Sequence, residues 1–250
     1  MKTIISRTND EIKQVITLHD AKGRKEHKQF IAEGLRICTT LIKSGMKTVQ
    51  LYATKEQVGL IMPPLVKEEL ITIVSESAME KISTATSPSG ILGVFEIPAQ
   101  PSFGDLQKGL VLAQIADPGN MGTLIRTAAA LNIKNVVIVE GADVWSPKVI
   151  QASGGTIAQV KIYNPSWEVL LKWKKDLRLC ALVVKGGKSP TQLDKNTLLV
   201  VGNEAHGIQK EWLRDVDDFM TIPMPGNVES LNAAVAGSIA LYLAFGSPAS

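Results

Sequence analysis

The sequence predicts an α/β protein with a small α/β sandwich followed by an open, doubly wound parallel sheet. Two observations predict this fold. Helical and strand patterns alternate along the chain, which is typical of layered α/β folds. From Gly109 onward the strand candidates are near-continuous apolar runs, which indicates burial on both faces of a parallel sheet. At 250 residues the chain can form one large domain or two small ones.

The expected first domain covers residues 1–98 and alternates short helices with short strands. Pro, Ser and Gly in residues 98–104 indicate a linker, so we expect a boundary there, with the linker at 99–107 and a second domain at 108–250. The expected elements are, in order, a helix with one face made by Ile12, Val15, Ile16 and His19, a strand Lys28–Ala32, a helix Leu35–Ile42 ending near Gly45, a strand Thr48–Ala53, a break at Pro63-Pro64, a strand Leu70–Val74, a helix opened by Ser75, and a strand Ile91–Ile97.

The expected second domain has buried strands separated by helices. Ligands of such sheets bind at the carboxyl ends of the strands, so the segments after each strand are candidate sites. The strands are Leu110–Ile115, Val136–Val139, Leu179–Val184, Leu198–Val201 and Phe219–Ile222, and the helices are Thr123–Leu131, Trp167–Lys175 and Leu231–Phe245.

Composition excludes several classes of protein. With 45% hydrophobic and 20% charged residues, the chain is not disordered, collagen-like or a coiled coil. Its apolar runs are far shorter than the ~20 residues that cross a bilayer, so no membrane partner is expected. The polar start, Met1–Asp10, matches no signal or transit peptide. Cys38 and Cys180 lack metal or redox spacing, so we expect core thiols, no metal and a reducing cytoplasm.

The positive charge of the chain is concentrated near its start. The formal net charge is +3, whereas Met1–Lys47 holds ten basic and five acidic residues. A clustered basic face attracts polyanions such as RNA. Solvated lysines on a small domain would give the same pattern, so both interpretations stay open.

The first candidate loop, Asp117–Thr123, follows the strand Leu110–Ile115. Its proline and two glycines predict a tight turn, and a helix start offers free N–H groups to an anion. Arg126 would lie about one turn into the helix and point back, so Asn120 and Arg126 would face one cleft. The alternative is an ordinary turn with a surface arginine.

The second candidate loop, Gly202–Gly207, follows the strand Leu198–Val201. Two glycines five residues apart let the backbone approach a ligand closely. The loop is neither a dinucleotide fingerprint nor a P-loop. The alternative is a helix-entry loop with Glu204 near the helix start. His206 is interpreted as a loop residue, because no cluster of metal-ligating or basic partners accompanies it.

The third candidate loop runs from Pro223 to Asn232. Ser230 is expected to cap the last helix. Asn232 would lie in the first helical turn, where it is a poor helix former, so a functional role is expected. The core stripe of this helix is expected to be Leu231, Val235, Ile239 and Leu243.

In order and spacing, these three segments resemble the signature motifs of the SpoU/TrmH branch of the SPOUT methyltransferases. The first motif holds Asn120 and Arg126, the second is Val200–Gly207, and the third is Ile222-Pro223-Met224 followed by Ser230-Leu231-Asn232. The resemblance covers residues 108–245. In addition, Phe30–Gly34 and Ile82–Gly93 resemble the family's ribosomal-protein-like substrate-binding domain.

The resemblance implies a SPOUT domain with a deep trefoil knot, S-adenosyl-L-methionine as cofactor, and a homodimer in which the last helix forms much of the interface. It implies methyl transfer to a ribose 2′-hydroxyl in RNA without a metal. The two-domain layout is similar to members that act on large-subunit (23S) rRNA, a guanosine being one target class. The alternatives are a tRNA target, a non-catalytic RNA-binding protein on the same scaffold, and a small-molecule nucleotide binder.

The resemblance also assigns residues to roles. Because neutralising a guanidinium at pH 7 costs about 8 kcal/mol, Arg126 is expected to act as an electrostatic clamp rather than as a base. Gln151 departs from the family's usual arginine, so RNA affinity or target choice is expected to differ. The implied residues are Arg126, Asn120, Ser230 and Asn232 for catalysis; Val201, Gly202, Asn203, Gly207, Ile222, Met224 and Leu231 for the cofactor; and Glu204, Lys148, Ser153, Arg24, Lys25, Glu33 and Arg36 for RNA, with Lys28 as a further phosphate contact.

Overall fold

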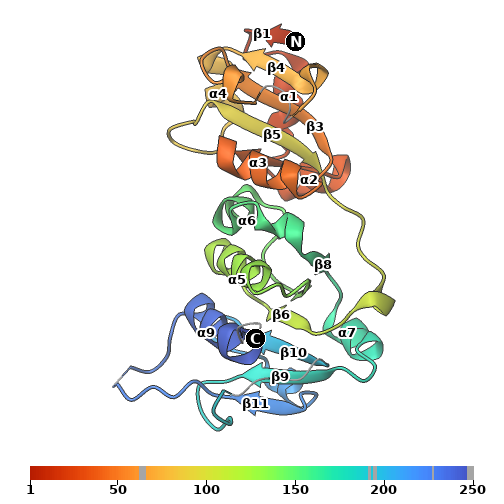
Figure 1. Cartoon of the computed structure of the whole chain (residues 1–250), viewed down its shortest axis with the longest axis vertical. Coiled ribbons are helices and arrows are strands. Elements are labelled where there is room, and N and C mark those ends of the chain that lie inside the picture. Colours follow the sequence, from red (N-terminus) through yellow and green to blue (C-terminus); the bar gives the residue numbers. More distant parts are fainter. Residues whose placement is uncertain (62–65, 191–192, 194–195, 227, 247–250) are drawn as a thin grey trace. The chain divides into compact units, whose positions relative to one another are not determined.

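A computed structural model describes residues 1–61, 66–190, 193, 196–226 and 228–246 (Figure 1). The break expected at Pro63-Pro64 lies outside the described residues. The chain divides into two compact units, Met1–Ala99 with Trp145–Ala158, and Gln100–Val144 with Gln159–Ser250. The segment Trp145–Ala158 falls in the range expected for the second domain, yet it makes its contacts with the first unit.

The first unit contains a five-stranded mixed sheet. Strands β1, β4 and β3 are parallel, while β5 runs antiparallel to both β3 and β2. The strand order is β1 (Lys2–Ile4), β4 (Ile71–Val74), β3 (Thr48–Thr54), β5 (Ile91–Glu96) and β2 (Gln29–Glu33). The described helices are α1 (Asp10–Thr17), α2 (Ala21–His27), α3 (Leu35–Lys43), α4 (Glu76–Ile82) and α6 (Pro147–Ser153), with 3₁₀ turns at Val58–Ile61, Glu68–Leu70 and Thr156–Gln159.

Both faces of this sheet are covered, as the predicted sandwich requires. Ile31 on β2 packs with α1 and α4 in one apolar cluster. Successive strand residues point to opposite faces. The next side chain, Phe30, therefore faces the other way, where it stacks on Phe95 and lies 5.0 Å from the ring of Trp145. Helix α2 was not predicted, because its sequence has no apolar periodicity.

The second unit contains a six-stranded, fully parallel sheet, which confirms the predicted architecture. Its order is β11 (Asp218–Met220), β9 (Arg178–Leu182), β10 (Thr197–Val201), β6 (Gly109–Ala113), β7 (Asn135–Val139) and β8 (Lys161–Tyr163). The edge strand β8 was missed because only three residues pair. The described helices are α5 (Pro118–Ala130), α7 (Trp167–Trp173), α8 (Lys210–Leu213) and α9 (Ala233–Phe245), with a 3₁₀ turn at Phe103–Asp105.

Helices cover both faces of the parallel sheet. On one face, α7 and α8 bring Trp167 and Trp212 into a parallel stack with ring centroids 4.7 Å apart. On the other face, α5 and α9 lie side by side (Figure 1). A Cβ atom at Gly237 would lie 2.5 Å from the side chain of Leu124. The absence of a side chain at Gly237 therefore lets α9 approach α5 closely.

The start of α5 differs from the prediction. The helix begins at Pro118, five residues earlier than expected, so residues expected to form a turn are helical. The side chain of Asp117 accepts a hydrogen bond from the Asn120 N–H, and Pro118 occupies the first turn. An aspartate cap followed by proline is a favourable helix start.

The start and the buried face of α9 also differ from the prediction. The helix is capped by Asn232, not by Ser230. The expected core stripe is wrong, because Val235, Ile239 and Leu243 are exposed, whereas small residues such as Ala240 and Ala244 are buried. The helix is apolar on nearly every side, so hydropathy could not show which face packs inward. Among the described residues, no helix has both the length and the hydropathy needed to span a bilayer.

Candidate active site

A pocket of about 320 Å³ opens where three parallel strands end, as the carboxyl-edge rule predicts. Segments that follow β9, β10 and β11 line it together with the first turns of α9. The predicted cofactor residues that line the pocket are Val201, Gly202, Asn203, Gly207, Ile222, Met224 and Leu231, and Glu204 and Ser230 line it as well.

The loop after β10 folds back on itself beside the pocket. The backbone groups of Asn203 and Gly207 exchange two hydrogen bonds of 2.9 Å. Gly207 has a φ of +69°, and a Cβ atom at Gly202 would lie 2.5 Å from the carbonyl carbon of Gly207. The close approach of the backbone therefore requires the absence of a side chain at Gly202, whereas Gly207 supplies the left-handed conformation of the loop.

The side chain of Asn203 holds this loop against the end of β6. Its Nδ2 donates to the carbonyl oxygen of Gln114 at 2.8 Å. Its Oδ1 accepts from the N–H groups of Ala205 and His206 at 2.9 and 3.2 Å. Asn203 thus lines the pocket, but its side-chain polar atoms are used within the protein.

A chain of side-chain hydrogen bonds connects all three predicted loops. Asn120 on α5 donates from Nδ2 to Oε1 of Glu204 at 2.9 Å, and its Oδ1 accepts from Nδ2 of Asn232 at 3.1 Å. The same Glu204 carboxylate accepts from the N–H groups of Ala116 and Asp117. Residues more than 80 positions apart in the sequence therefore meet beside the pocket.

The environment of Glu204 keeps its carboxyl group ionised. Partial burial raises the pKa, but the hydrogen bonds from Asn120 and from backbone N–H groups outweigh it, so the pKa of Glu204 lies below its ordinary value. Both carboxylate oxygens already accept hydrogen bonds. Glu204 is therefore a structural anion of the loop, and the expectation that it contacts RNA stays a prediction.

Asn232 and Ser230 play different parts in the third loop. Oδ1 of Asn232 accepts from the N–H groups of Ala234 and Val235, which caps α9. Asn232 is thus both the helix cap and the end of the hydrogen-bond chain. Ser230 is exposed at the pocket, and its hydroxyl has no hydrogen bond within the described part of the chain, so it is available to a ligand.

Arg126 lies apart from the pocket of its own chain. It is exposed on α5, is absent from the pocket lining, and has no ion pair or hydrogen bond among the residues that the structure describes. Six residues along a helix correspond to directions about 120° apart. Arg126 and Asn120 therefore leave α5 in different directions, and the expectation that they face one cleft stays a prediction.

Two residues expected to contact RNA, Arg24 and Ser153, point into the first unit instead. Arg24 is 4% exposed, and its guanidinium donates to the carbonyl oxygens of Leu18 and His19 at 2.8 and 2.7 Å. Ser153 is fully buried and donates to the carbonyl oxygen of Ile150. For Arg24 and Ser153 the expectation is corrected to a structural role, because buried groups with internal partners do not reach phosphates.

Glu33 likewise serves the first unit. Its carboxylate accepts from the Ser83 hydroxyl at 2.6 Å and from the N–H and hydroxyl of Thr84 at 2.7 and 2.6 Å. It thus holds the segment after α4 and is corrected from an RNA contact to a loop anchor. In contrast, four further residues of this unit are exposed, and their contact with RNA stays a prediction: Lys25, Lys28, Arg36 and Lys148, with Gln151 also exposed on the helix of Lys148.

The pocket also holds residues that the sequence analysis did not single out. His206 was interpreted as a loop residue, yet it lines the pocket. The segment Leu182–Val184 forms one wall, and its place at the end of a predicted strand was the available signal. The remaining missed lining residues are Ala205, Ala233 and Ala236. No group of three or more metal-ligating side chains occurs among the described residues.

Comparison with known proteins agrees with this geometry. The model of the SpoU rRNA methylase family matches residues 108–242, which include all three loops. The chain belongs to this family. A second model, an MRM3-like substrate-binding domain, matches residues 9–93. As a family member, the chain is a methyltransferase that uses S-adenosylmethionine.

Individual relatives share the full two-unit layout. The chain is 27% identical to a 23S rRNA (guanosine(2553)-2′-O)-methyltransferase of Bacillus subtilis, with 97% of this chain and 98% of the relative covered. It is 29% identical to a 23S rRNA (uridine(2479)-2′-O)-methyltransferase of Streptomyces viridochromogenes, covering 90% and 85%. An AdoMet-bound rRNA methyltransferase from Sinorhizobium meliloti superposes with a TM-score of 0.87 at 28% identity, covering 100% and 99%.

The hydrogen-bond chain predicts a pH-dependent defect for Asn120→Asp. The new carboxylate would face Glu204 and repel it, so we expect the melting temperature to fall by about 3 °C or more at pH 7.5. Near pH 5 the pair can share a proton, which restores a hydrogen bond, and the deficit should shrink. In the unsubstituted protein the pKa of Glu204 lies below the ordinary glutamate value. The contribution of the Glu204 carboxylate to folding stability is therefore fully present above the ordinary glutamate pKa and is lost as the pH falls through the lowered pKa.

Differential scanning fluorimetry between pH 5 and 7.5 measures this effect. Asn120→Ser is the matched control, because a neutral replacement should give a deficit that does not change with pH. A deficit of Asn120→Asp that stays constant across this range would contradict the proposed contact with Glu204.

Proposed function

We propose that the protein methylates a ribose 2′-hydroxyl of large-subunit (23S) rRNA, with a guanosine as the target. The observation that carries the proposal is the pocket at the strand ends, where the three motif loops meet and are tied together by Asn120, Glu204 and Asn232. Two relatives that span the whole chain are named for 23S rRNA 2′-O-methylation, one of guanosine and one of uridine. A tRNA target is the second candidate, supported by relatives named tRNA/rRNA methyltransferases.

The pocket fits the cofactor of this family. Its volume lies at the lower end of the range for small-molecule sites. Apolar walls from Val201 and Met224 suit the adenine ring and the methylene groups next to the sulfonium, while the close backbone at Gly202 offers N–H and C=O groups to polar edges. When bound, S-adenosylmethionine supplies an electrophilic methyl group and needs no metal to activate it.

The chain's own residues must position the ribose and stabilise the developing negative charge on its oxygen. Arg126 is the exposed cation of the first motif and has no internal partner among the described residues, so it is available to clamp a substrate phosphate and, in the proposed dimer, to act on the 2′-oxygen at the pocket of the second copy. Ser230 presents its hydroxyl to the pocket. Asn120 and Asn232 keep these loops in register through Glu204.

The first unit is proposed to bind the RNA. Lys25, Arg36 and Lys148 are exposed there, and their charges suit phosphate oxygens. Gln151 is exposed on the same helix as Lys148 and cannot supply the ion pair that an arginine would make, so target choice should differ from that of members with arginine. A cytoplasmic location is proposed together with this substrate.

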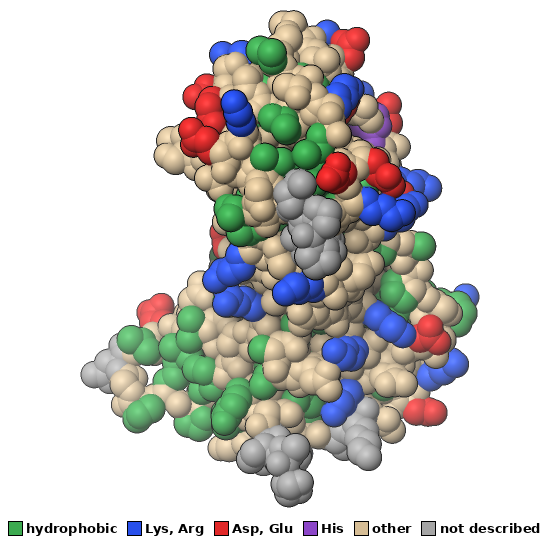
Figure 2. Space-filling view, turned by 45° about the horizontal axis from the view of Figure 1, so that its top comes forward, with side chains coloured by type: hydrophobic (Ala, Val, Ile, Leu, Met, Phe, Trp, Pro, Cys, Tyr) green, Lys and Arg blue, Asp and Glu red, His purple; other side chains and the backbone are tan. Residues whose placement is uncertain are grey.

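The second unit is proposed to form the deep trefoil knot and the homodimer of this family. The segments after β9 and β11 lie together at the pocket, as knot loops would. Four large apolar side chains of α9 are exposed on one helix face, namely Val235, Ile239, Tyr242 and Leu243. Figure 2 shows hydrophobic side chains gathered on this part of the surface. A second copy of the chain would cover them.

Methyl transfer from labelled S-adenosylmethionine to separate pools of unmodified tRNA and 23S rRNA tests the proposed reaction. Alkali cannot cleave the phosphodiester on the 3′ side of a 2′-O-methyl ribose, because that ribose lacks the attacking 2′-hydroxyl. Label should therefore survive in alkali-stable dinucleotides from the rRNA pool, and digestion should release 2′-O-methylguanosine. Label in the tRNA pool alone would support the second candidate, and cofactor binding without transfer to either pool would overturn both.

Arg126→Ala is expected to reduce methyl transfer at least ~100-fold, because removal of one preorganised cationic donor costs about that much. Calorimetric titration should show unchanged S-adenosylmethionine affinity, since Arg126 does not line the pocket. Arg126→Lys is the matched control, because lysine keeps the charge without the fork of donors. Its methyl-transfer activity should lie between those of Arg126→Ala and the unsubstituted protein. Full activity of Arg126→Ala would contradict the assigned role.

Ile239→Glu is expected to convert the proposed dimer into monomers, because a carboxylate at the centre of the exposed α9 face cannot be buried against a second copy. Sedimentation velocity measures the result. Leu60→Glu changes an equally apolar, exposed residue in the first unit and should leave the dimer intact. A monomeric unsubstituted protein, or a dimeric Ile239→Glu variant, would contradict this interface.

A further inference from the structure

We propose that Thr221 is a positioning residue for the cofactor pocket. Its hydroxyl fastens segment 183–188, which follows β9, to the end of β11. The proposal rests on the proposed function in one respect, namely that the ligand of this pocket is S-adenosylmethionine. Thr221 itself does not line the pocket, so it acts through the residues beside it.

Segment 183–188 turns and returns to β11, where Lys188 forms a parallel bridge with Met220. Val183 N–H donates to the carbonyl oxygen of Met220 at 2.9 Å where the segment begins. Where it ends, Lys188 N–H donates to the carbonyl oxygen of Phe219, and Thr221 N–H donates to the carbonyl oxygen of Lys188, both at 2.9 Å. The hydroxyl of Thr221 adds one more bond, because it accepts from Gly187 N–H at 2.9 Å.

The approach at Gly187 is too close for any side chain. A Cβ atom there would lie 2.5 Å from the carbonyl carbon of Met220 and 2.7 Å from both N and Oγ1 of Thr221. The preceding residue, Gly186, has a φ of +83° and makes the turn. Two successive glycines in the sequence thus allow the backbone N–H of Gly187 to reach the threonine hydroxyl.

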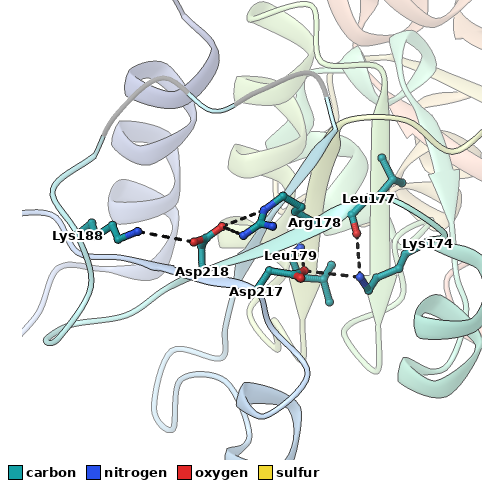
Figure 3. Close-up of polar contacts among 7 residues, drawn as sticks. All are labelled: Lys174, Leu177, Arg178, Leu179, Lys188, Asp217 and Asp218. Carbon is teal, nitrogen blue, oxygen red and sulfur yellow. Dashed lines mark hydrogen bonds and ion pairs between the residues drawn. The ribbon is translucent and has the colours of Figure 1, made fainter.

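Other contacts at this edge of the sheet contribute less. Figure 3 shows Asp218 on β11 between Arg178 and Lys188, at 2.6 Å and 3.9 Å. The side chain of Lys188 is 87% exposed, and such exposed ion pairs are worth little. Asp217 accepts from Leu179 N–H at 2.8 Å and fixes only the start of β11. The Thr221 hydroxyl, in contrast, bonds at the residue next to Ile222, which lines the pocket.

The fastened segments form a wall of the pocket. Val183 and Val184 line it from one strand end, and Ile222, the residue after Thr221, lines it from the other. Strand β11 is three residues long; it pairs with β9 on one side, and among the described residues Lys188 alone bridges to it on the other. Loss of the hydroxyl leaves Gly187 N–H without its acceptor, which weakens the connection between the two parts of the wall while the backbone hydrogen bonds remain.

Thr221→Val and Thr221→Ser test the proposal. Valine keeps the shape without the acceptor, whereas serine keeps the hydroxyl. We expect Thr221→Val to raise the Kd for S-adenosylmethionine about tenfold, as measured by calorimetry. The Kd of Thr221→Ser should stay within about twofold of that of the unsubstituted protein. The KM for the cofactor should rise in parallel, while kcat at saturating cofactor should stay within about twofold.

Two controls separate the possible outcomes. Thr40→Val removes a hydroxyl that bonds only to the carbonyl oxygen of Arg36 in its own helix, and it should leave the Kd unchanged. If Thr221→Val does not fold, Gly187→Ala, which forces segment 183–188 away from β11, must raise the Kd by a similar factor. A Kd for Thr221→Val equal to that of the unsubstituted protein, or no rescue by serine, would overturn the proposal. If the unsubstituted protein itself binds no S-adenosylmethionine, the proposed function fails first.

Discussion

The hydrogen-bond chain from Glu204 through Asn120 to Asn232 is the interaction on which the candidate site depends. It joins the loops after β6 and β10 to the start of α9. Two members also bind backbone groups, since Glu204 accepts from N–H groups of the first loop and Asn232 caps α9. The charge of Glu204 strengthens these bonds, because hydrogen bonds to an ionised acceptor are about twice as strong as neutral ones.

The parallel sheet brings these loops to one edge, and close packing keeps them there. The carboxyl ends of β9, β10 and β11 all lie on the same side, so their following segments converge on one pocket. Small residues at the buried face of α9, above all Gly237, let the helix approach Leu124 and Val201. The large apolar residues of α9 then face outward, where a second copy of the chain is proposed to bind.

The two units have different proposed roles. The second unit provides the pocket, while the first unit carries the exposed cations proposed to hold RNA. Several polar residues that resemble substrate contacts in the sequence serve the scaffold instead. Arg24 satisfies carbonyl groups between two helices, and Glu33 anchors the segment after α4. A buried charged group needs internal partners, so these residues are fixed by folding and are not free to bind.

The sequence by itself determined the α/β class and the fully parallel second sheet, which depend on a local signal, namely apolar runs. The seven residues that the family resemblance implies for the cofactor all line one pocket, and their contact with the cofactor stays a prediction. Only the tertiary structure decided that Asn232 caps α9, that α9 turns Ile239 outward, and that Arg126 lies apart from the pocket. The physical reason is that a helix apolar on nearly every side, or a polar side chain with several possible partners, is oriented by its neighbours in space. Those neighbours are distant in the sequence and leave no local pattern.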